Sequence, residues 1–258
     1  MNPLYRLYTR RLRRQLVGLP RPRHIAIVMD GNRRWARRAG LDDVRLGHRF
    51  GAQHLEQFLG WCAAADVRCV TAWVASADNI RRRDSAEVDY LMQLAETVLA
   101  DHVRRDHRWR LHIAGQLDLL PDSTARALKE AVEATRDRTN AGDLTIAIGY
   151  SGRLEVIDAI RGVLDEAAAS GRSLTDVATT LTEADITSHL YVPDLPDPDL
   201  VIRTSGELRM SDFLLWQATR SDIHFSDHYW PAFREVDLLR ALRTYARRKA
   251  VAASNNLG

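Results

Sequence analysis

Cysteine is scarce in this chain: its 258 residues include only two, Cys62 and Cys69. One pair of this kind forms neither a disulfide framework nor a zinc-ligand pattern. We therefore expect a reducing compartment, the cytoplasm, and we interpret both residues as small buried hydrophobic side chains.

Long apolar runs are also missing from the sequence. No stretch approaches the roughly 18 to 20 apolar residues that cross a bilayer. The first residues lack the succession of charged, apolar and small residues that defines a signal peptide. The sequence thus predicts a cytoplasmic protein without a transmembrane segment.

Several well-known catalytic motifs do not occur. There is no Gly-x-x-x-x-Gly-Lys-Ser/Thr loop and no Gly-x-Gly-x-x-Gly fingerprint, so nucleotide binding is not indicated. No Gly-x-Ser-x-Gly elbow is present, and no histidines or cysteines have zinc spacing. The chemistry must therefore come from other residue types.

The composition is that of an ordinary globular protein, with 45% hydrophobic and 28% charged residues. Lysine and arginine total 37 against 34 acidic residues, a net charge of +3. This small excess suits an anionic ligand, an anionic membrane surface or nucleic acid. Because no nucleic-acid-binding module is recognisable, we expect no nucleic-acid partner.

Helical and strand-like patterns alternate along the chain. Apolar strand-like runs occupy residues 25–29, 69–75, 110–114, 144–148 and 200–203, with a sixth candidate at 223–225. Helical patterns occupy residues 47–64, 85–105, 123–138, 154–169 and 235–252. This alternation predicts an α/β fold with a mostly parallel sheet flanked by helices.

We interpret residues 1–258 as a single domain, with an N-terminal arm at 1–20 and a core at 23–245. Residues 3–16 have the pattern of a basic amphipathic helix. Such a helix could lie on an anionic bilayer as a peripheral contact, or pack on the domain itself. Pro20 and Pro22 then favour a linker.

Residues 24–37 carry the most informative pattern. Four apolar residues precede Met29 and Asp30, a Gly-Asn turn follows, and arginines occupy positions 33, 34, 37 and 38. The run predicts a buried strand that delivers Asp30 to its carboxyl end. A carboxylate beside arginines that favour phosphate is a candidate Mg²⁺ ligand, although a capping Asp before a solvated helix is an equally good interpretation.

Three further blocks bear polar groups at or after strand ends. Ser76 to Arg83 contains three successive arginines, and Arg82 is a candidate phosphate ligand. Residues 199–217 place Arg203, Arg209 and Ser211 around a Gly turn, which suits a diphosphate. Asp222 precedes the last strand candidate and is either a second metal ligand or a strand cap. Ligands of open α/β sheets bind beyond such strand ends.

These blocks together resemble the cis-prenyl transferase family, which includes undecaprenyl diphosphate synthase and short-chain actinobacterial synthases of (2Z,6E)-farnesyl diphosphate. The motifs Met-Asp-Gly-Asn-x-Arg-Trp-Ala and Asp-Leu-Val-Ile-Arg-Thr-Ser-Gly-Glu-x-Arg-x-Ser carry the resemblance. It implies a central, mostly parallel six-stranded sheet with a hydrophobic cleft, and a homodimer. It also implies Mg²⁺-dependent condensation of isopentenyl diphosphate with an allylic diphosphate, leaving a new Z double bond.

The resemblance also assigns roles. Asp30 becomes the metal-linked catalytic carboxylate, Asn79 the proton acceptor or relay, and Asp222 the second metal-linked acid. The allylic diphosphate is assigned Gly31, Asn32, Arg33, Arg34, Trp35, His48 and Arg82, and the substrate-binding turn is assigned Ser76, Ala77, Asp78 and Ile80. Isopentenyl diphosphate is assigned Arg203, Arg209 and Ser211, and Met210 is assigned to the substrate-binding residues as well.

The chain departs from the family pattern in places. Ser76 to Ile80 replace a usual Ser-Ser-Glu-Asn-Trp, Asp222 replaces Glu, and the C-terminal Arg-Arg-Phe/Tyr-Gly is not matched. Trp73 or Val74 replaces a small residue low in the tunnel, and strand alternation leaves open which one lines it.

A bulky tunnel floor predicts a short product, (2Z,6E)-farnesyl diphosphate from geranyl diphosphate. The alternatives are a long-chain decaprenyl or undecaprenyl diphosphate synthase and a non-catalytic partner subunit.

Overall fold

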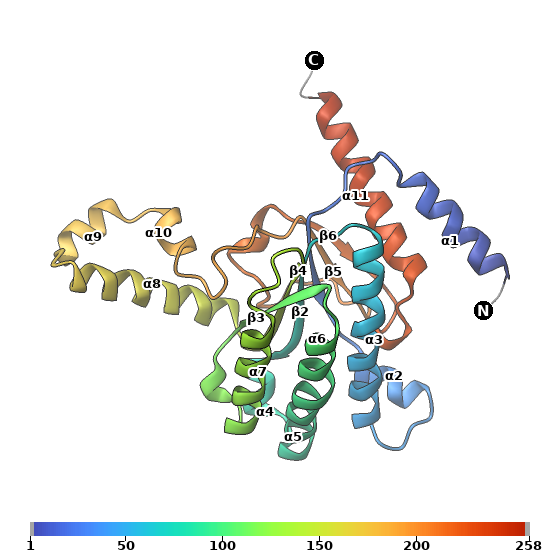
Figure 1. Cartoon of the computed structure of the whole chain (residues 1–258), viewed down its shortest axis with the longest axis horizontal. Helices are drawn as coiled ribbons and strands as arrows, with labels where there is room; N and C mark the ends of the chain where they lie inside the picture. Colours follow the sequence, from blue (N-terminus) through green and yellow to red (C-terminus); the bar gives the residue numbers. More distant parts are fainter. Residues whose placement is uncertain (1–2, 256–258) are drawn as a thin grey trace.

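The computed structural model of the chain describes residues 3–255. Six strands form one sheet in the order β3-β4-β2-β1-β5-β6 (Figure 1). These strands are β1 (His24–Val28), β2 (Cys69–Ser76), β3 (Trp109–Ala114), β4 (Gly142–Tyr150), β5 (Leu200–Arg203) and β6 (Asp222–Phe225). All five neighbouring pairs are parallel. The predicted α/β sheet is confirmed, and it is entirely parallel.

Helices connect and flank these strands. They are α1 (Pro3–Gln15), α2 (Asn32–Arg38), α3 (Arg45–Ala64), α4 (Ala77–Arg82), α5 (Ser85–Leu94), α6 (Asp101–Arg105), α7 (Asp122–Thr135), α8 (Gly152–Ala169), α9 (Leu174–Thr180), α10 (Glu183–Thr187) and α11 (Glu235–Asn255). The single helix expected over 85–105 is divided, because a π-helical segment, η1 (Ala95–Ala100), separates α5 from α6.

Strand alternation sorts the core onto the two faces of the sheet. Ile25 and Ile27 of β1 join a large cluster with the inner faces of α3, α5, α7 and α11. Ala26 and Val28 point the other way, where Phe213 and other residues of the 210–218 segment complete a second cluster. Successive residues of a strand alternate between faces, so the apolar run of β1 is buried on both.

Helix α8 runs outward from the sheet, and α9 and α10 lie along it to form a projecting arm (Figure 1). Val163 and Ala167 of α8 pack against Val177 of α9 as a small separate cluster. Ser173 and Asp176 form a capping box at the start of α9, with each side chain bonded to the other's backbone N–H.

The N-terminal helix packs on the domain, which was one of the two alternatives for it. In α1, Leu12 is 1% exposed against α11, and Arg13 forms an ion pair with Glu235. Arg240 of α11 lies 5.4 Å from the ring centroid of Tyr8. Membrane contact stays a prediction. Within residues 3–255 no helix is both long and apolar enough to span a bilayer.

Both cysteines are buried and unpaired, as predicted. Burial raises the pKa of the Cys69 thiol to about 11, because an apolar environment disfavours the thiolate. The two residues therefore act as packing side chains.

One buried imidazole links folding to pH. The His54 ring lies edge-on between Trp61 and Trp230, with centroid distances of 5.5 and 4.8 Å. Burial lowers the pKa of His54 to about 4 from 6.5. The unfolded chain therefore binds a proton between these values that the folded chain does not, and stability is lost as pH falls.

We predict that His54→Phe weakens this acid sensitivity while keeping the aromatic contacts. Urea unfolding at pH 7.5 and 5.0 should show a loss of unfolding free energy smaller by about 2 kcal/mol in the variant. The exposed His107 provides the control, and His107→Gln should retain the wild-type pH difference. Equal pH differences in the wild type and His54→Phe would contradict the assignment.

Candidate active site

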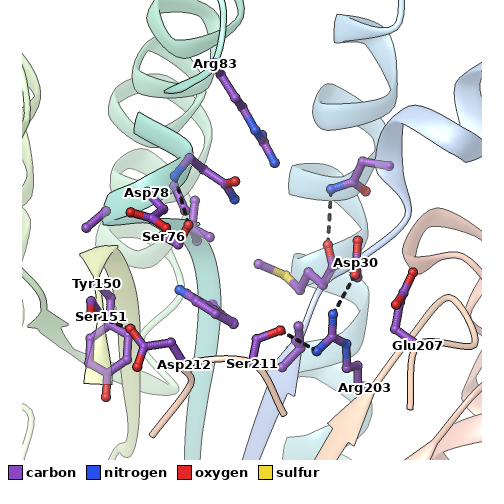
Figure 2. Close-up of a pocket in the computed structure, with 18 of the residues that line it drawn as sticks. Asp30, Ser76, Asp78, Arg83, Tyr150, Ser151, Arg203, Glu207, Ser211 and Asp212 are labelled. Carbon is purple, nitrogen blue, oxygen red and sulfur yellow. Dashed lines mark hydrogen bonds and ion pairs between the residues drawn. The ribbon is translucent and has the colours of Figure 1, made fainter. Parts of the chain in front are cut away.

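The carboxyl ends of three neighbouring strands, β2, β1 and β5, lie side by side at one end of the sheet. Val28 of β1 pairs with Trp73 of β2 and with Arg203 of β5, so the residues that follow these strands emerge side by side. They border a cavity of about 1100 Å³. Figure 2 shows side chains from both sides pointing into this space. The predicted blocks around Asp30, Ser76 and Arg203 therefore share one site.

Hydrogen bonds to its backbone hold Asp30 at the end of β1. Its N–H donates to Oγ1 of the buried Thr204 at 3.0 Å, and that hydroxyl donates to the Asp30 carbonyl at 2.8 Å. The Gly31 N–H donates to Asp30 Oδ1 at 2.8 Å. Gly31 has φ +100°, and a Cβ there would lie 2.7 Å from the Tyr229 ring, so the turn requires glycine.

A buried guanidinium joins Asp30 to the second anion-binding segment. Arg203 Nη2 lies 3.1 Å from Asp30 Oδ2, and the Arg203 side chain is only 5% exposed. Its Nη1 donates to Ser211 Oγ at 2.9 Å and to the Arg209 carbonyl. Ser211 adopts φ +56°, a sparsely populated conformation that places its hydroxyl on Arg203.

Arg34 of α2 reaches across to the same loop. Its Nη2 donates to Ser205 Oγ at 2.8 Å and lies 3.7 Å from Asp30 Oδ1. Glu207 lies 3.4 Å from Arg34 and 3.3 Å from Arg209. Arg34 and Arg209 are well exposed and face carboxylates that an incoming phosphate can replace.

The turn after β2 forms the opposite wall. Ser76 caps α4, and its Oγ accepts from the Asn79 N–H at 3.0 Å. Ser76, Ala77, Asp78 and Asn79 all line the cavity. The cap fixes the backbone of the segment and so fixes where Asn79 lies.

A cluster of three cationic or protonatable side chains forms a further part of this wall. Arg33, His48 and Arg83 line the cavity, and all three contact the carboxylate of Glu87. Burial lowers the pKa of His48, so its imidazole is neutral at neutral pH. Burial and the neighbouring Arg33 charge lower the pKa of Arg83, which remains a cation.

Arginine dominates the lining of the cavity. The lining arginines are Arg33, Arg34, Arg37, Arg81, Arg83, Arg153, Arg203 and Arg209, and the lining carboxylates are Asp30, Asp78, Glu207 and Asp212. Guanidinium groups bind phosphate oxygens bidentately, so this cavity favours ligands with several negative charges.

The apolar side of the site begins at Val74. Trp73 stacks on Phe213 at 5.0 Å in the cluster on one face, whereas Val74 packs against the larger core on the other. Val74 also lines a second cavity of about 40 Å³ with Leu91, Leu94 and Leu99. Trp73 and Val74 thus both line the main cavity, but only Val74 also borders the smaller apolar cavity.

Four other predicted substrate-binding residues do not line the main cavity. Arg82 has a side chain 80% exposed, and Arg81 and Arg83 line the wall on either side of it. Ile80 packs on the core and Met210 on the second cluster. Trp35 packs on Phe50 at 5.1 Å and borders a different groove.

The structure separates the two predicted metal-linked carboxylates. Asp222 begins β6 and pairs with Leu200 at the amino end of β5, whereas Asp30 follows the carboxyl end of β1. The two residues therefore lie at opposite ends of the parallel strands and do not share one site within this chain, and the metal-binding role of Asp222 stays a prediction. Asp222 instead lies 3.4 Å from Arg248.

The structure adds residues that the sequence patterns did not reveal. The sequence pattern favoured Arg82 over Arg83, because a run of three arginines does not show which side chain points into the cavity. Glu87 looks like an ordinary first-turn acid of a helix, and only folding brings it to His48. Tyr150, Asp212 and Arg153 line the cavity from β4, the 210–218 segment and α8.

Within the part of the chain that the structure describes, no three His, Cys, Asp or Glu side chains gather as a metal cluster. A single carboxylate is still a suitable Mg²⁺ anchor when a substrate phosphate completes the coordination. Asp30 fits this requirement, because its side chain is 35% exposed and borders the cavity.

The arrangement can therefore hold two phosphorylated groups side by side, beside a carboxylate and an apolar recess. A profile of the prenyltransferase family described as "Putative undecaprenyl diphosphate synthase" matches residues 28–252.

Two relatives match almost the full length of the chain. An "Isoprenyl transferase" of Streptomyces fradiae is 57% identical over 247 residues, covering 95% of both chains. A "(2Z,6E)-farnesyl diphosphate synthase" of Thermobifida fusca is 48% identical over 250 residues, covering 96% of both.

A solved structure agrees with this assignment. Lavandulyl diphosphate synthase from Lavandula x intermedia, in complex with dimethylallyl diphosphate, matches with a TM-score of 0.80 and 28% identity over 87% of this chain and 95% of that one. The chain belongs to the undecaprenyl diphosphate synthase family of prenyltransferases.

Proposed function

We propose that the protein is a Mg²⁺-dependent cis-prenyl transferase that condenses isopentenyl diphosphate with an allylic diphosphate. The observation that carries the proposal is the Asp30 carboxylate, which is paired with Arg203 and stands between two sets of arginines, close to an apolar recess. One set, on α2 and around α4, suits the allylic diphosphate. The other, Arg203 and Arg209 with Ser211, suits isopentenyl diphosphate.

The chemistry follows from the charges that develop. Breaking the allylic C–O bond places negative charge on the departing diphosphate, and arginines at fixed positions stabilise it without reorganising. A Mg²⁺ ion held by Asp30 and the substrate phosphates would neutralise part of the same charge. The second arginine set holds the alkene of isopentenyl diphosphate near the allylic carbon.

A proton must then leave the new chain to form the double bond. Asn79 lies on the cavity wall, where its amide oxygen can accept that proton or relay it to a departing diphosphate oxygen. The Ser76 cap holds this part of the wall in place.

We further propose a short product, (2Z,6E)-farnesyl diphosphate formed from geranyl diphosphate. Val74, Leu91, Leu94 and Leu99 leave a recess of only about 40 Å³, so the apolar end of the site favours a short chain over a long one. Each added isoprene unit brings five carbons, so a long chain would need a wider recess than Val74 and the three leucines leave.

We also propose that the enzyme acts as a homodimer. The edge strand β6 carries Ile223, which is 38% exposed, and Asp222 Oδ2 is buried with no hydrogen-bond partner among residues 3–255. An exposed parallel edge strand favours coverage by another element.

Sedimentation equilibrium at micromolar concentration should give twice the chain mass of 29.2 kDa, and a monomer mass would refute the proposal.

Asp30→Asn should lower turnover by about a thousandfold or more, because the variant loses the charge that would anchor Mg²⁺. The amide oxygen still accepts from Arg203, so the fold should persist. Radiolabelled isopentenyl diphosphate with geranyl diphosphate measures the rate, and thermal unfolding checks the fold.

Asp194 is exposed and serves as the control, so Asp194→Asn should retain wild-type turnover. Wild-type turnover in Asp30→Asn would refute the metal role, and an inactive wild type would favour a non-catalytic partner subunit.

Val74→Ala should lengthen the product by one or more isoprene units, because truncation opens the wall between the two cavities. Chain-length analysis of the extracted products measures this. Val70→Ala makes the same truncation on the same strand and face without touching either cavity, so its product should remain unchanged. A wild-type ladder reaching ten or more isoprene units would instead support a long-chain synthase.

A further inference from the structure

Glu87 lies directly behind the part of the wall assigned to the allylic diphosphate. It belongs to the first turn of α5, its residue is 9% exposed, and it does not line the cavity itself. The three side chains that contact its carboxylate, Arg33, His48 and Arg83, all do. The carboxylate thus stands between the protein interior and a set of groups that face the substrate.

The contacts of this carboxylate are divided between its two oxygens. His48 Nε2 lies 3.0 Å from Oε1, and Arg83 Nη1 donates to the same oxygen at 3.1 Å. Arg33 Nη1 donates to Oε2 at 3.4 Å. Hydrogen bonds to a charged acceptor are the stronger and more directional kind, so this one group restrains three side chains.

The three partners come from separate segments of the chain. Arg33 is on α2, His48 is on α3, and Arg83 is at the end of α4. Sequence separation from Glu87 ranges from 4 to 54 residues. Figure 2 shows Arg83 pointing from α4 toward the space beside Asp30. A single carboxylate therefore ties together three elements that would otherwise bring mutually repelling charges to one place.

The charges explain why a carboxylate is required. Two guanidinium groups held close together repel each other, and an intervening carboxylate offsets part of that repulsion while leaving a net positive charge for a phosphate. The carboxylate also selects the His48 tautomer with a proton on Nε2, because that nitrogen must donate to it. His48 then keeps Nδ1 as an acceptor.

We infer that Glu87 is a positioning residue that holds Arg33, His48 and Arg83 in the arrangement that binds the allylic diphosphate. This inference rests on the proposed function. It differs from a structural role because its effect should fall on one substrate: the second arginine set, on Arg203 and Arg209, has no contact with Glu87.

Glu87→Gln tests the inference with the shape of the side chain preserved. The amide replaces one accepting oxygen with a donor and removes the negative charge, so two arginines lose their common partner. We expect the KM for geranyl diphosphate to rise about tenfold while the KM for isopentenyl diphosphate stays within about twofold of wild type. Calorimetric titration with geranyl diphosphate alone should show the same loss of affinity without turnover.

Glu96→Gln is the matched control. Glu96 lies nine positions further along the same helical stretch and accepts from the Ser123 and Thr124 hydroxyls at 2.9 and 2.6 Å, away from the cavity. Its substitution should leave both KM values unchanged. Thermal unfolding of both variants shows how much stability each loses.

The outcomes separate the inference from the proposed function. Equal changes in both KM values, or a lower melting temperature with unchanged kinetics and affinity, would overturn the positioning role. A wild-type protein that neither binds geranyl diphosphate nor turns it over would overturn the proposed function itself. A selective loss for geranyl diphosphate in Glu87→Gln supports both.

Discussion

The site depends on one ion pair between two neighbouring strands. Asp30 follows β1 and Arg203 ends β5, and the parallel register sets their side chains 3.1 Å apart. Arg203 is almost fully buried, so its charge must be compensated, and Asp30 together with the Ser211 hydroxyl and a loop carbonyl provides that compensation. The same arrangement fixes a carboxylate and a guanidinium at the centre of the cavity, with the remaining arginines around them.

Two carboxylates hold the arginines of the site together. Glu207 bridges Arg34 and Arg209, and Glu87 bridges the three side chains of the opposite wall. Glu207 lines the cavity, so a diphosphate can take its place. Glu87 lies behind the wall and does not line the cavity. The two acids thus have different relations to the ligand although each pairs with arginines.

Much of this architecture could be predicted from the sequence. The apolar run before Asp30 indicates a strand that is buried on both faces of its sheet. Helices that alternate with such strands can cover both faces, and this pattern predicts a parallel sheet. Strand ends that share an edge then gathered Asp30, Ser76 and Arg203. Asp222 does not join them, because it lies at the start of β6 and therefore at the other end of the parallel strands.

The sequence by itself determined the class of fold, the acid at the end of the first strand and the arginine-rich character of the site. Local patterns suffice for these three properties, since the residues next to each other in the sequence indicate which segments are buried and where a strand ends. Tertiary structure alone decided that Val74 and not Trp73 faces the recess, that Arg83 and not Arg82 lines the wall, and that Glu87 gathers Arg33 and His48. Each of these depends on a register shift or on contacts between segments distant along the chain, which no local pattern records.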